Sequence, residues 1–262
     1  MTSILGIDLL HSLSGFLVGV LVGQTGVGGG SLMTPLLVLV FGIHPATAVG
    51  TDLLYAAATK SVGTLTHGLH GTVNWRIVGR LAVGSVPATL LTLLAMSRFE
   101  TLGSGSARIL TTGLGVALVL TSMALLSRRR ILAYTARRMP WLDGPHVATA
   151  TVILGVVMGV IVTLSSVGAG AIGMTVLVML YRREPLPQLV GSDIAHAVPL
   201  TLIAGIGHWF VGSVDWMLLV ALLTGSIPGV IVGTLLSVRL PDWILRPVLA
   251  VTLLMVGGKL LL

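Results

Sequence analysis

The sequence contains no cysteine and very little charge. Of its 262 residues, only 9% are Asp, Glu, Lys or Arg, and only 5% are aromatic. The absence of cysteine excludes disulfides, thiol chemistry and cysteine-ligated metal sites. Soluble domains carry about 25% charged residues, so the low charge excludes a soluble globular domain of this length.

Apolar residues make up most of what remains. Hydrophobic residues account for 55% of the chain, and the mean hydropathy is +1.04. Several apolar runs reach the roughly 20 residues that a helix needs to cross a bilayer. The 34 glycines fit this pattern, because small residues let membrane helices approach closely. We therefore predict an all-α polytopic membrane protein. The first residues lack a basic segment, so we expect no cleavable signal.

The net charge of +7 is concentrated in one short segment. Its arginines are Arg128, Arg129, Arg130, Arg137 and Arg138. A basic loop beside an apolar span is typical of the cytoplasmic side of a membrane. We therefore interpret residues 128–145 as a cytoplasmic linker that contacts anionic lipid headgroups, and we expect no nucleic-acid partner.

The chain contains an internal repeat with a period of 141 residues. At this shift, and without a gap, three pairs of segments match: Val49–Leu53 with Val190–Ile194, Gly71–Trp75 with Gly212–Trp216, and Gly84–Pro87 with Gly225–Pro228. Two related apolar halves are typical of membrane transporters. We predict one transmembrane repeat in residues 1–127 and a second in residues 146–262.

Each half is predicted to contain five helical segments. The expected segments are Ile4–Val22, Ser31–Phe41, Ala46–Thr66, Ile77–Met96 and Arg108–Ser127, then His146–Leu164, Ala171–Leu180, Leu189–Gly207, Trp216–Ser237 and Ile244–Leu261. The second segment of each half is too short to cross a bilayer, so we expect a broken or re-entrant helix pair followed by three transmembrane helices. An odd number of segments per half gives the halves opposite orientations, which predicts an inverted repeat with both termini outside.

The short segments follow glycine-rich stretches. These are Gly26–Gly30 in the first half and the weaker counterpart Ser165–Gly170 in the second. Glycine disfavours a continuous helix, and a non-helical backbone at membrane depth must be buried in protein or line a wet cavity. Two breaks at equivalent positions favour a cavity between the halves.

Very few ionisable residues lie inside the predicted spans, and the clear set is Asp52, Lys60, Asp193 and His196. Each is costly in a membrane and therefore needs a partner or a function. Asp52 and Asp193 occupy the same repeat position, whereas Lys60 matches Thr201. Lys60 is about 12 Å from Asp52 by helical rise, which favours a partner or an anion from the other half.

Two interpretations of the aspartates remain open. They could cap broken helices or pair structurally with Lys60 and His196. Alternatively, at least one could gain and lose a proton during transport, because desolvation disfavours a charged carboxylate. His196 lies three residues after Asp193, on the same helix face, and could share that proton. We assign coupling to Asp52, Asp193 and His196.

A small anion is the ligand that suits the glycine-rich breaks. Backbone N–H groups at helix starts attract negative charge, and neutral side chains beside them can bind an oxyanion without trapping it. The predicted substrate-binding residues are Gln24, Thr25, Gly28, Gly29, Gly30, Lys60, Ser165, Ser166, Gly168 and Gly170.

The sequence contains no recognisable catalytic motif. It has neither a His-Glu-x-x-His zinc signature nor a nucleophile elbow, so we expect no enzyme activity, no cofactor and no metal site. A serine–histidine pair formed by Ser165 or Ser166 with His208 has nothing in the sequence to fix its geometry. His67 and His208 lie at span ends near Trp75 and Trp216, and we interpret both histidines as interfacial anchors.

Several of these motifs resemble a known family. The stretch Gly26–Leu37, which reads GVGGGSLMTPLL, and the following Ala48–Leu54, AVGTDLL, resemble the sulfite exporter family TauE/SafE. The motifs at Gly191–Asp193 and Gly225–Gly229 fit the same family, and the resemblance covers essentially the whole chain. It implies an inner-membrane permease that exports sulfite or organosulfonates such as sulfoacetate, with the glycine loops as the substrate region.

Together, these observations predict a secondary transporter that exports a small sulfur-containing oxyanion, coupled to protons, with its site between the repeats. One alternative is a cation-coupled or cation-transporting carrier that uses the paired aspartates as ligands. A passive channel is a further alternative, although a continuous pore fits poorly with breaks in both halves.

Overall fold

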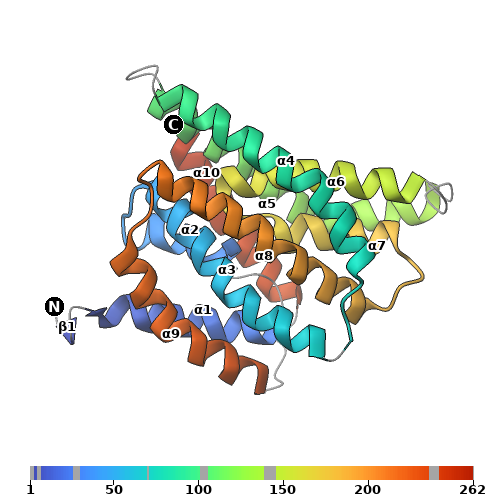
Figure 1. Ribbon diagram of the computed structural model, residues 1–262, viewed down its shortest axis with the longest axis horizontal. Helices are drawn as coiled ribbons and strands as arrows, with labels where there is room; N and C mark the ends of the chain where they lie inside the picture. The colour runs from blue at the N-terminus through green and yellow to red at the C-terminus, as the bar shows by residue number, and fades with distance from the viewer. Residues whose placement is uncertain are drawn as a thin grey trace.

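The computed structural model describes residues 3–4, 7–25, 30–69, 71–100, 106–138, 146–235 and 242–261. Within these residues the chain is almost entirely helical (Figure 1). The helices are α1 (Leu9–Thr25), α2 (Gly30–Leu39), α3 (Pro45–Leu69), α4 (Trp75–Glu100), α5 (Ser106–Arg138), α6 (His146–Ser165), α7 (Met174–Leu180), α8 (Leu186–Phe210), α9 (Trp216–Leu235) and α10 (Asp242–Leu261). A π-helix, η2 (Ala169–Gly173), precedes α7, and the two-residue strands β1 (Ser3–Ile4) and β2 (Ile7–Asp8) pair antiparallel near the N-terminus.

The all-helical class predicted from the sequence is confirmed. Each expected segment overlaps a helix, including the short second segments, which are α2 and the η2–α7 pair. The first was predicted from Ile4, but Ile4 and Ile7–Asp8 lie in the strands and α1 begins at Leu9. The segments long and apolar enough to cross a membrane include Trp75–Arg98, His146–Ser165, Leu186–Phe210 and Trp216–Gly233. These are the apolar parts of α4, α6, α8 and α9, so the described chain has the composition of a multi-pass membrane protein.

The basic segment after the first half differs from the prediction. We expected a loop from residue 128, but α5 continues as one helix to Arg138. The physical reason is that Arg, Leu and Ala are good helix formers, and residues 128–138 contain neither Gly nor Pro. Residues 139–145 lie outside the described residues.

The central helices α3 and α8 pack against each other and are flanked by two further helix pairs. In Figure 1, α4 and α6 run along the upper side of this pair, and α1 and α9 run along the lower side. Helices α5 and α10 form another contacting pair. Each outer pair therefore joins the first helix of one half to the fourth helix of the other.

Glycines make both outer pairs possible. A Cβ at Gly225 of α9 would overlap the backbone of Ser12 in α1, and a Cβ at Gly84 of α4 would overlap the backbone of Val152 in α6. Gly84 and Gly225 occupy the same position in the 141-residue repeat. The repeated sequence thus produces the same close helix contact twice, as small residues commonly do in membranes.

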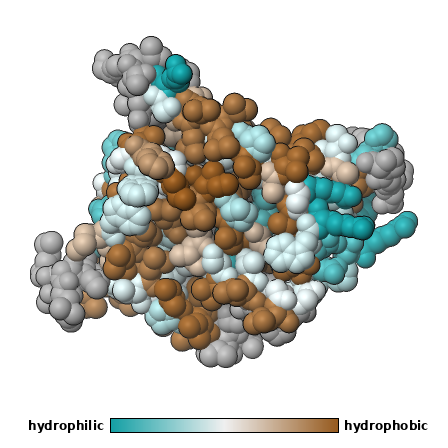
Figure 2. Space-filling view, viewed as in Figure 1, coloured by the Kyte–Doolittle hydropathy of each residue, from teal (hydrophilic) through white to brown (hydrophobic). Residues whose placement is uncertain are grey.

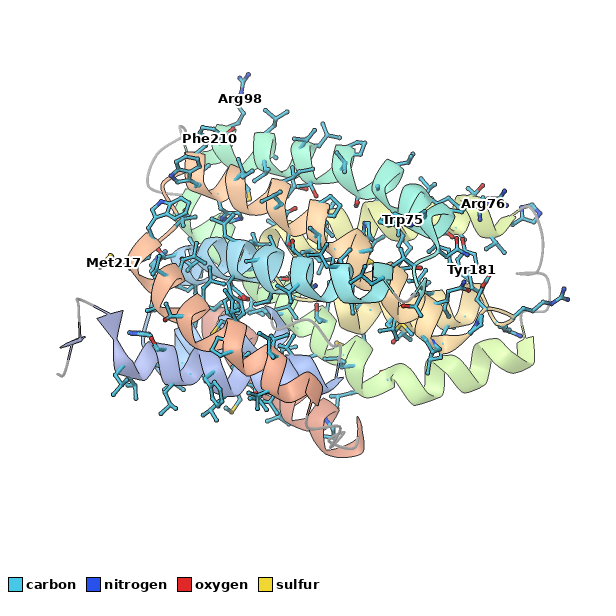
Figure 3. The ribbon with its side chains drawn as sticks, turned by 60° about the horizontal axis from the view of Figure 1, so that its bottom comes forward. Trp75, Arg76, Arg98, Tyr181, Phe210 and Met217 are labelled. Carbon is cyan, nitrogen blue, oxygen red and sulfur yellow. The ribbon has the colours of Figure 1, made fainter. Side chains whose placement is uncertain are left out.

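The surface has an apolar middle and distinct ends. In Figure 2, apolar side chains cover most of the visible face, while hydrophilic side chains gather at its right-hand edge. Figure 3 places Arg98, Phe210 and Met217 at one end of the helices and Trp75, Arg76 and Tyr181 at the other. A broad apolar face of this kind is the surface expected of a protein that faces lipid.

Candidate functional site

The four ionisable residues singled out in the sequence are buried on the central helices. Asp52 and Lys60 lie on α3, and Asp193 and His196 lie on α8. Asp52 and His196 are fully buried, whereas Asp193 and Lys60 are only 5% and 7% exposed. A buried charge is costly unless it is paired, so this cluster is the strongest candidate for function.

Helices α3 and α8 cross in opposite directions, and the crossing places Lys60 between the aspartates. Gly63 faces Ile194 at one side of the crossing, and Gly205 faces Leu54 at the other. Lys60 lies between Leu54 and Gly63 along α3. Lys60 is therefore one turn from the contact of Gly63 with Ile194, the residue that follows Asp193.

Asp52 is held by hydrogen bonds from α2. The backbone N–H of Thr34 donates to Asp52 Oδ2 at 3.2 Å, and the Thr34 hydroxyl donates to the same oxygen. Ser166 also lies beside Asp52, while the second oxygen, Oδ1, has no hydrogen-bond partner. A carboxylate that accepts such bonds is stabilised in its charged form.

Asp193 has a different environment from its repeat counterpart. Its Oδ1 has no hydrogen-bond partner and lies against Gly173 of η2, where an added Cβ would be 2.6 Å from this oxygen. The neighbouring N–H groups of Ile172 and Gly173 are directed to the carbonyl of Gly168, at 2.9 and 3.4 Å. The π-helix backbone therefore approaches Asp193 while its N–H groups bond elsewhere.

Matching hydrogen bonds connect each central helix to the fourth helix of the other half. The Tyr55 hydroxyl donates to Ser226 Oγ at 2.8 Å, and a 2.8 Å hydrogen bond joins His196 Nε2 to Ser85 Oγ. Tyr55 corresponds to His196 in the repeat, and Ser85 corresponds to Ser226. Each bond crosses between the halves. Tyr55, Ser85 and Ser226 were not among the predicted site residues, although the 141-residue shift relates Tyr55 to His196 and Ser85 to Ser226.

The hydroxyl residue before each aspartate holds a loop of the other half. The N–H of Asp215 donates to Thr51 Oγ1 at 3.0 Å, and the N–H of Asn74 donates to Ser192 Oγ at 2.8 Å. Thr51 and Ser192 are repeat equivalents, as are Asn74 and Asp215. The Thr/Ser-Asp motif therefore combines a structural hydroxyl with a buried carboxyl group.

The two serines of the second glycine-rich break, Ser165 and Ser166, have different hydrogen-bonding environments. Ser165 Oγ donates to the Ile161 carbonyl at 2.8 Å and accepts from Val167 N–H at 3.2 Å, so it satisfies the backbone at the end of α6. Ser166 is buried, has a left-handed φ of 57°, and its Oγ has no hydrogen-bond partner. Left-handed conformations are uncommon for residues other than glycine and often occur at functional sites. Ser166 is therefore the better candidate for a ligand contact.

Other predicted binding residues are placed less completely. Gly168 has φ of 114° at the start of η2, which contains Gly170. Gly30 is the first residue of α2, and Gln24 and Thr25 are the last residues of α1. The side chains of Gln24 and Thr25 lie outside the described residues. Gly28 and Gly29 lie outside them altogether, so their binding roles stay predictions.

His208 differs from its predicted interfacial position. It is only 2% exposed, and its Nε2 forms a 2.9 Å hydrogen bond with the Thr163 carbonyl of α6. The interpretation as an interfacial anchor is wrong for His208, because α8 packs against α6 at this point. The same bond directs His208 to a backbone carbonyl rather than to Ser165 or Ser166. The side chain of His67 lies outside the described residues.

The described residues contain no group of three or more His, Asp or Glu side chains that could hold a metal ion. The cluster is instead a mixed one, in which a single lysine faces two carboxyl groups and a histidine. Unpartnered atoms remain on Asp52, Asp193, His196 and Ser166. This arrangement can bind a small ion and exchange protons.

Comparison with known proteins places the chain among membrane transporters. Residues 12–260 match the family described as sulfite exporter TauE/SafE. The chain is 40% identical to the probable membrane transporter protein YjnA of Bacillus subtilis, over 95% of this chain and 98% of that protein. It is 30% identical to the probable membrane transporter protein YdhB of the same organism, over 94% and 97%.

A probable membrane transporter protein of Xylella fastidiosa is 28% identical, over 86% of this chain and 83% of that protein. No solved structure matches the chain. The family match spans nearly all of the described helices. The chain is therefore a membrane transporter, and it belongs to the sulfite exporter TauE/SafE family.

Proposed function

We propose that this protein is a secondary transporter that exports sulfite or organosulfonates such as sulfoacetate across the cell inner membrane, coupled to protons. The substrate site is the crossing of α3 and α8. The observation that carries the proposal is the buried Lys60 at the crossing of α3 and α8, with Asp52 on one helix and Asp193 on the other at equivalent positions of the repeat.

The two halves act as inverted repeats around this site. Support comes from the paired contacts: Tyr55 with Ser226 corresponds to His196 with Ser85, and the α1–α9 contact corresponds to the α6–α4 contact. Secondary transporters place their sites near the bilayer midplane at such a repeat interface, with discontinuous helices beside them. The break before η2 and α7 supplies the discontinuous segment of the second half.

The chemistry of the cluster favours an anion. The ammonium group of Lys60 attracts an oxyanion and repels a cation, which argues against a cation carrier that uses the same aspartates. The unpartnered Ser166 hydroxyl is a neutral donor beside Asp52. Carboxyl groups in this position can carry the coupling proton. Sulfite and sulfonates follow from the family name and stay part of the proposal.

The orientation is also part of the proposal. The end with Arg76 and Tyr181 (Figure 3) faces the cytoplasm, because arginines accumulate on that side of a membrane. The basic segment 128–145 lies there as a linker between the repeats 1–127 and 146–262. The end with Arg98, Phe210 and Met217 faces outward.

Uptake of radiolabelled sulfite into proteoliposomes tests the function. We expect saturable uptake that a pH gradient drives and that competing sulfonates inhibit. The Lys60→Met variant tests the site, because methionine has an unbranched side chain of similar shape without the charge. We expect its uptake to be close to that of protein-free vesicles. If instead the protein carried a cation, with a flux that depends on sodium and not on the pH gradient, the proposed anion transporter would be wrong and the cation carrier would be supported.

A further inference from the structure

We propose that the two equivalent aspartates have different roles: Asp193 carries the coupled proton and competes with the substrate anion for Lys60, whereas Asp52 stays ionised throughout the cycle. This inference rests on the proposed function. It adds separate roles for the two aspartates, the number of protons that move with each anion, and the preferred charge of the substrate. The sequence treats the two aspartates alike, because each follows the same Gly-Thr/Ser motif.

The first support is the difference in hydrogen-bond donors. Asp52 Oδ2 accepts from both the backbone and the hydroxyl of Thr34, and these donors stabilise its carboxylate. Asp193 Oδ1 lies against Gly173 without a donor, since the nearby N–H groups are directed to Gly168. A buried carboxylate that lacks donors depends on a neighbouring cation.

The second support is the placement of that cation. Lys60 lies one turn before Gly63, which faces Ile194, the residue that follows Asp193, whereas Asp52 lies about two helical turns from Lys60 on α3. Thr201 stands at the equivalent position of the second half, so the lysine is not duplicated. One ammonium group thus serves one carboxylate, and an arriving anion must compete with Asp193 for it.

The surroundings of Asp193 contain few other charges. Lys60 is the charged group of α3 on the part of that helix near Asp193, and His196 lies one turn along α8, whereas Asp52 and Tyr55 lie farther along α3. Among the described residues, the other helices beside the cluster present uncharged groups, namely Ser85 of α4, Met158 of α6 and Gly173 of η2. Tyr55 and His196 are hydrogen-bonded to Ser226 and Ser85. Asp193 is therefore the carboxyl group whose protonation most directly releases Lys60.

The coupled step follows from this competition. A proton from water adds to the Asp193 carboxylate, one O–H bond forms, and Lys60 loses its anionic partner. The substrate oxyanion then takes that place, and after reorientation the anion leaves while the O–H proton returns to water. One monovalent anion and one proton cross together, and no net charge moves.

This exchange keeps the charge of the cluster constant. The empty cluster holds two carboxylates and one ammonium group. The loaded cluster holds one carboxylate, one ammonium group and the anion. Both forms carry one net negative charge, so both can reorient at a similar electrostatic cost. Hydrogen sulfite and singly charged sulfonates fit this balance. Sulfoacetate, which carries a carboxylate beside its sulfonate, adds an uncompensated charge, so the inference narrows the proposed substrates to monoanions.

Transport driven separately by a pH gradient and by a membrane potential tests the inference in proteoliposomes, with a radiolabelled sulfonate as the probe. For the wild type we expect about tenfold accumulation per unit of pH gradient, because each anion moves with one proton, and no accumulation from a membrane potential alone. Asp193→Asn should lose accumulation driven by the pH gradient and gain a response to the potential. Asp52→Asn should be slower but keep the response to the pH gradient.

Asp215→Asn serves as the matched control, because Asp215 caps α9 through Leu218 N–H outside the cluster and asparagine preserves that cap. Accumulation driven by the pH gradient in Asp193→Asn would overturn the inference while leaving the anion transporter intact. No uptake by the correctly inserted wild type would overturn the proposed function and, with it, this inference.

A binding measurement covers the case in which Asp193→Asn does not fold. Isothermal titration calorimetry of the wild type with the sulfonate, in two buffers of different ionisation enthalpy, reports the protons taken up per anion bound. We expect uptake that approaches one proton at high pH. Binding without proton uptake at every pH would overturn the inference.

Discussion

Single side chains distinguish the two otherwise equivalent sides of the site. Lys60 stands opposite Thr201 in the repeat, and Tyr55 stands opposite His196. The hydrogen bonds of Tyr55 and His196 are preserved despite the change of residue type, whereas the charge of Lys60 has no counterpart. Because one half carries lysine where the other carries threonine, two otherwise similar halves give the site a single cationic position.

Thr34 is expected to stabilise the fold through Asp52. Replacing it by valine keeps the shape but removes the hydroxyl donor, so a buried carboxylate loses one of its hydrogen bonds, at a cost of about 1–3 kcal/mol. We predict a lower unfolding temperature for Thr34→Val in detergent, measured by differential scanning fluorimetry.

The matched control is Thr59→Val, because the Thr59 hydroxyl bonds only to carbonyls of its own helix, those of Tyr55 and Ala56. That variant should stay within about 0.5 kcal/mol of the wild type. Thr34→Ser should restore most of the loss. Equal unfolding temperatures for Thr34→Val and Thr59→Val would show that the Thr34 hydroxyl does not support Asp52.

At the scale of helices, close backbone contacts position the site. The pairs α1–α9 and α4–α6 flank the central helices (Figure 1), and Ser85 and Ser226 directly follow Gly84 and Gly225. The glycine that lets two helices approach is thus adjacent to the serine that bonds His196 or Tyr55. Packing and site geometry depend on the same turn of each helix.

Substitution of these glycines should disturb both helix pairs. A Cβ at Gly84 would overlap the Val152 backbone, and overpacking of this kind costs about 1–3 kcal/mol. We predict that Gly84→Ala and Gly225→Ala each lower the unfolding temperature in detergent. Gly79→Ala is the control, because nothing lies within 4 Å of a Cβ at that position of α4. A loss of stability in Gly79→Ala as large as in Gly84→Ala would point to helix backbone effects rather than packing.

For the whole molecule, the polar ends define how it crosses the membrane. Arg98 lies at the end with Phe210 and Met217, and Arg76 lies at the opposite end (Figure 3). The arrangement requires that these two arginines reach opposite sides of the bilayer. The chain contains no cysteine, so single cysteines can report each side without background.

We predict that Arg98→Cys and Arg76→Cys react on opposite sides of intact cells. A membrane-impermeant maleimide added outside should label Arg98→Cys and should label Arg76→Cys only after the membrane is permeabilised, as the placement of arginines in the cytoplasm requires. Both variants should be tested for transport to verify their fold. Labelling of both cysteines from outside would contradict the proposed crossing of α4.

Much of the fold was predictable because membrane helices depend on composition and length. The expected segments agree with the observed helices, including the short α2 and α7. The basic segment was predicted as a loop although its residues favour a helix to Arg138. Charge marks where the apolar span ends but not where the helix ends, because arginine is a good helix former.

The sequence by itself determined the membrane class, the duplication and the small set of buried ionisable residues, because these depend on composition and on local order along the chain. Only the tertiary structure decided that Thr34 bonds Asp52, that Asp193 Oδ1 has no donor, and that His208 is buried against Thr163. These features depend on contacts between residues that are far apart along the chain. His208 and Thr163 are separated by 45 residues, and Tyr55 and Ser226 by 171 residues. Such contacts are set by how the helices pack, and neither periodicity nor spacing along the chain encodes them.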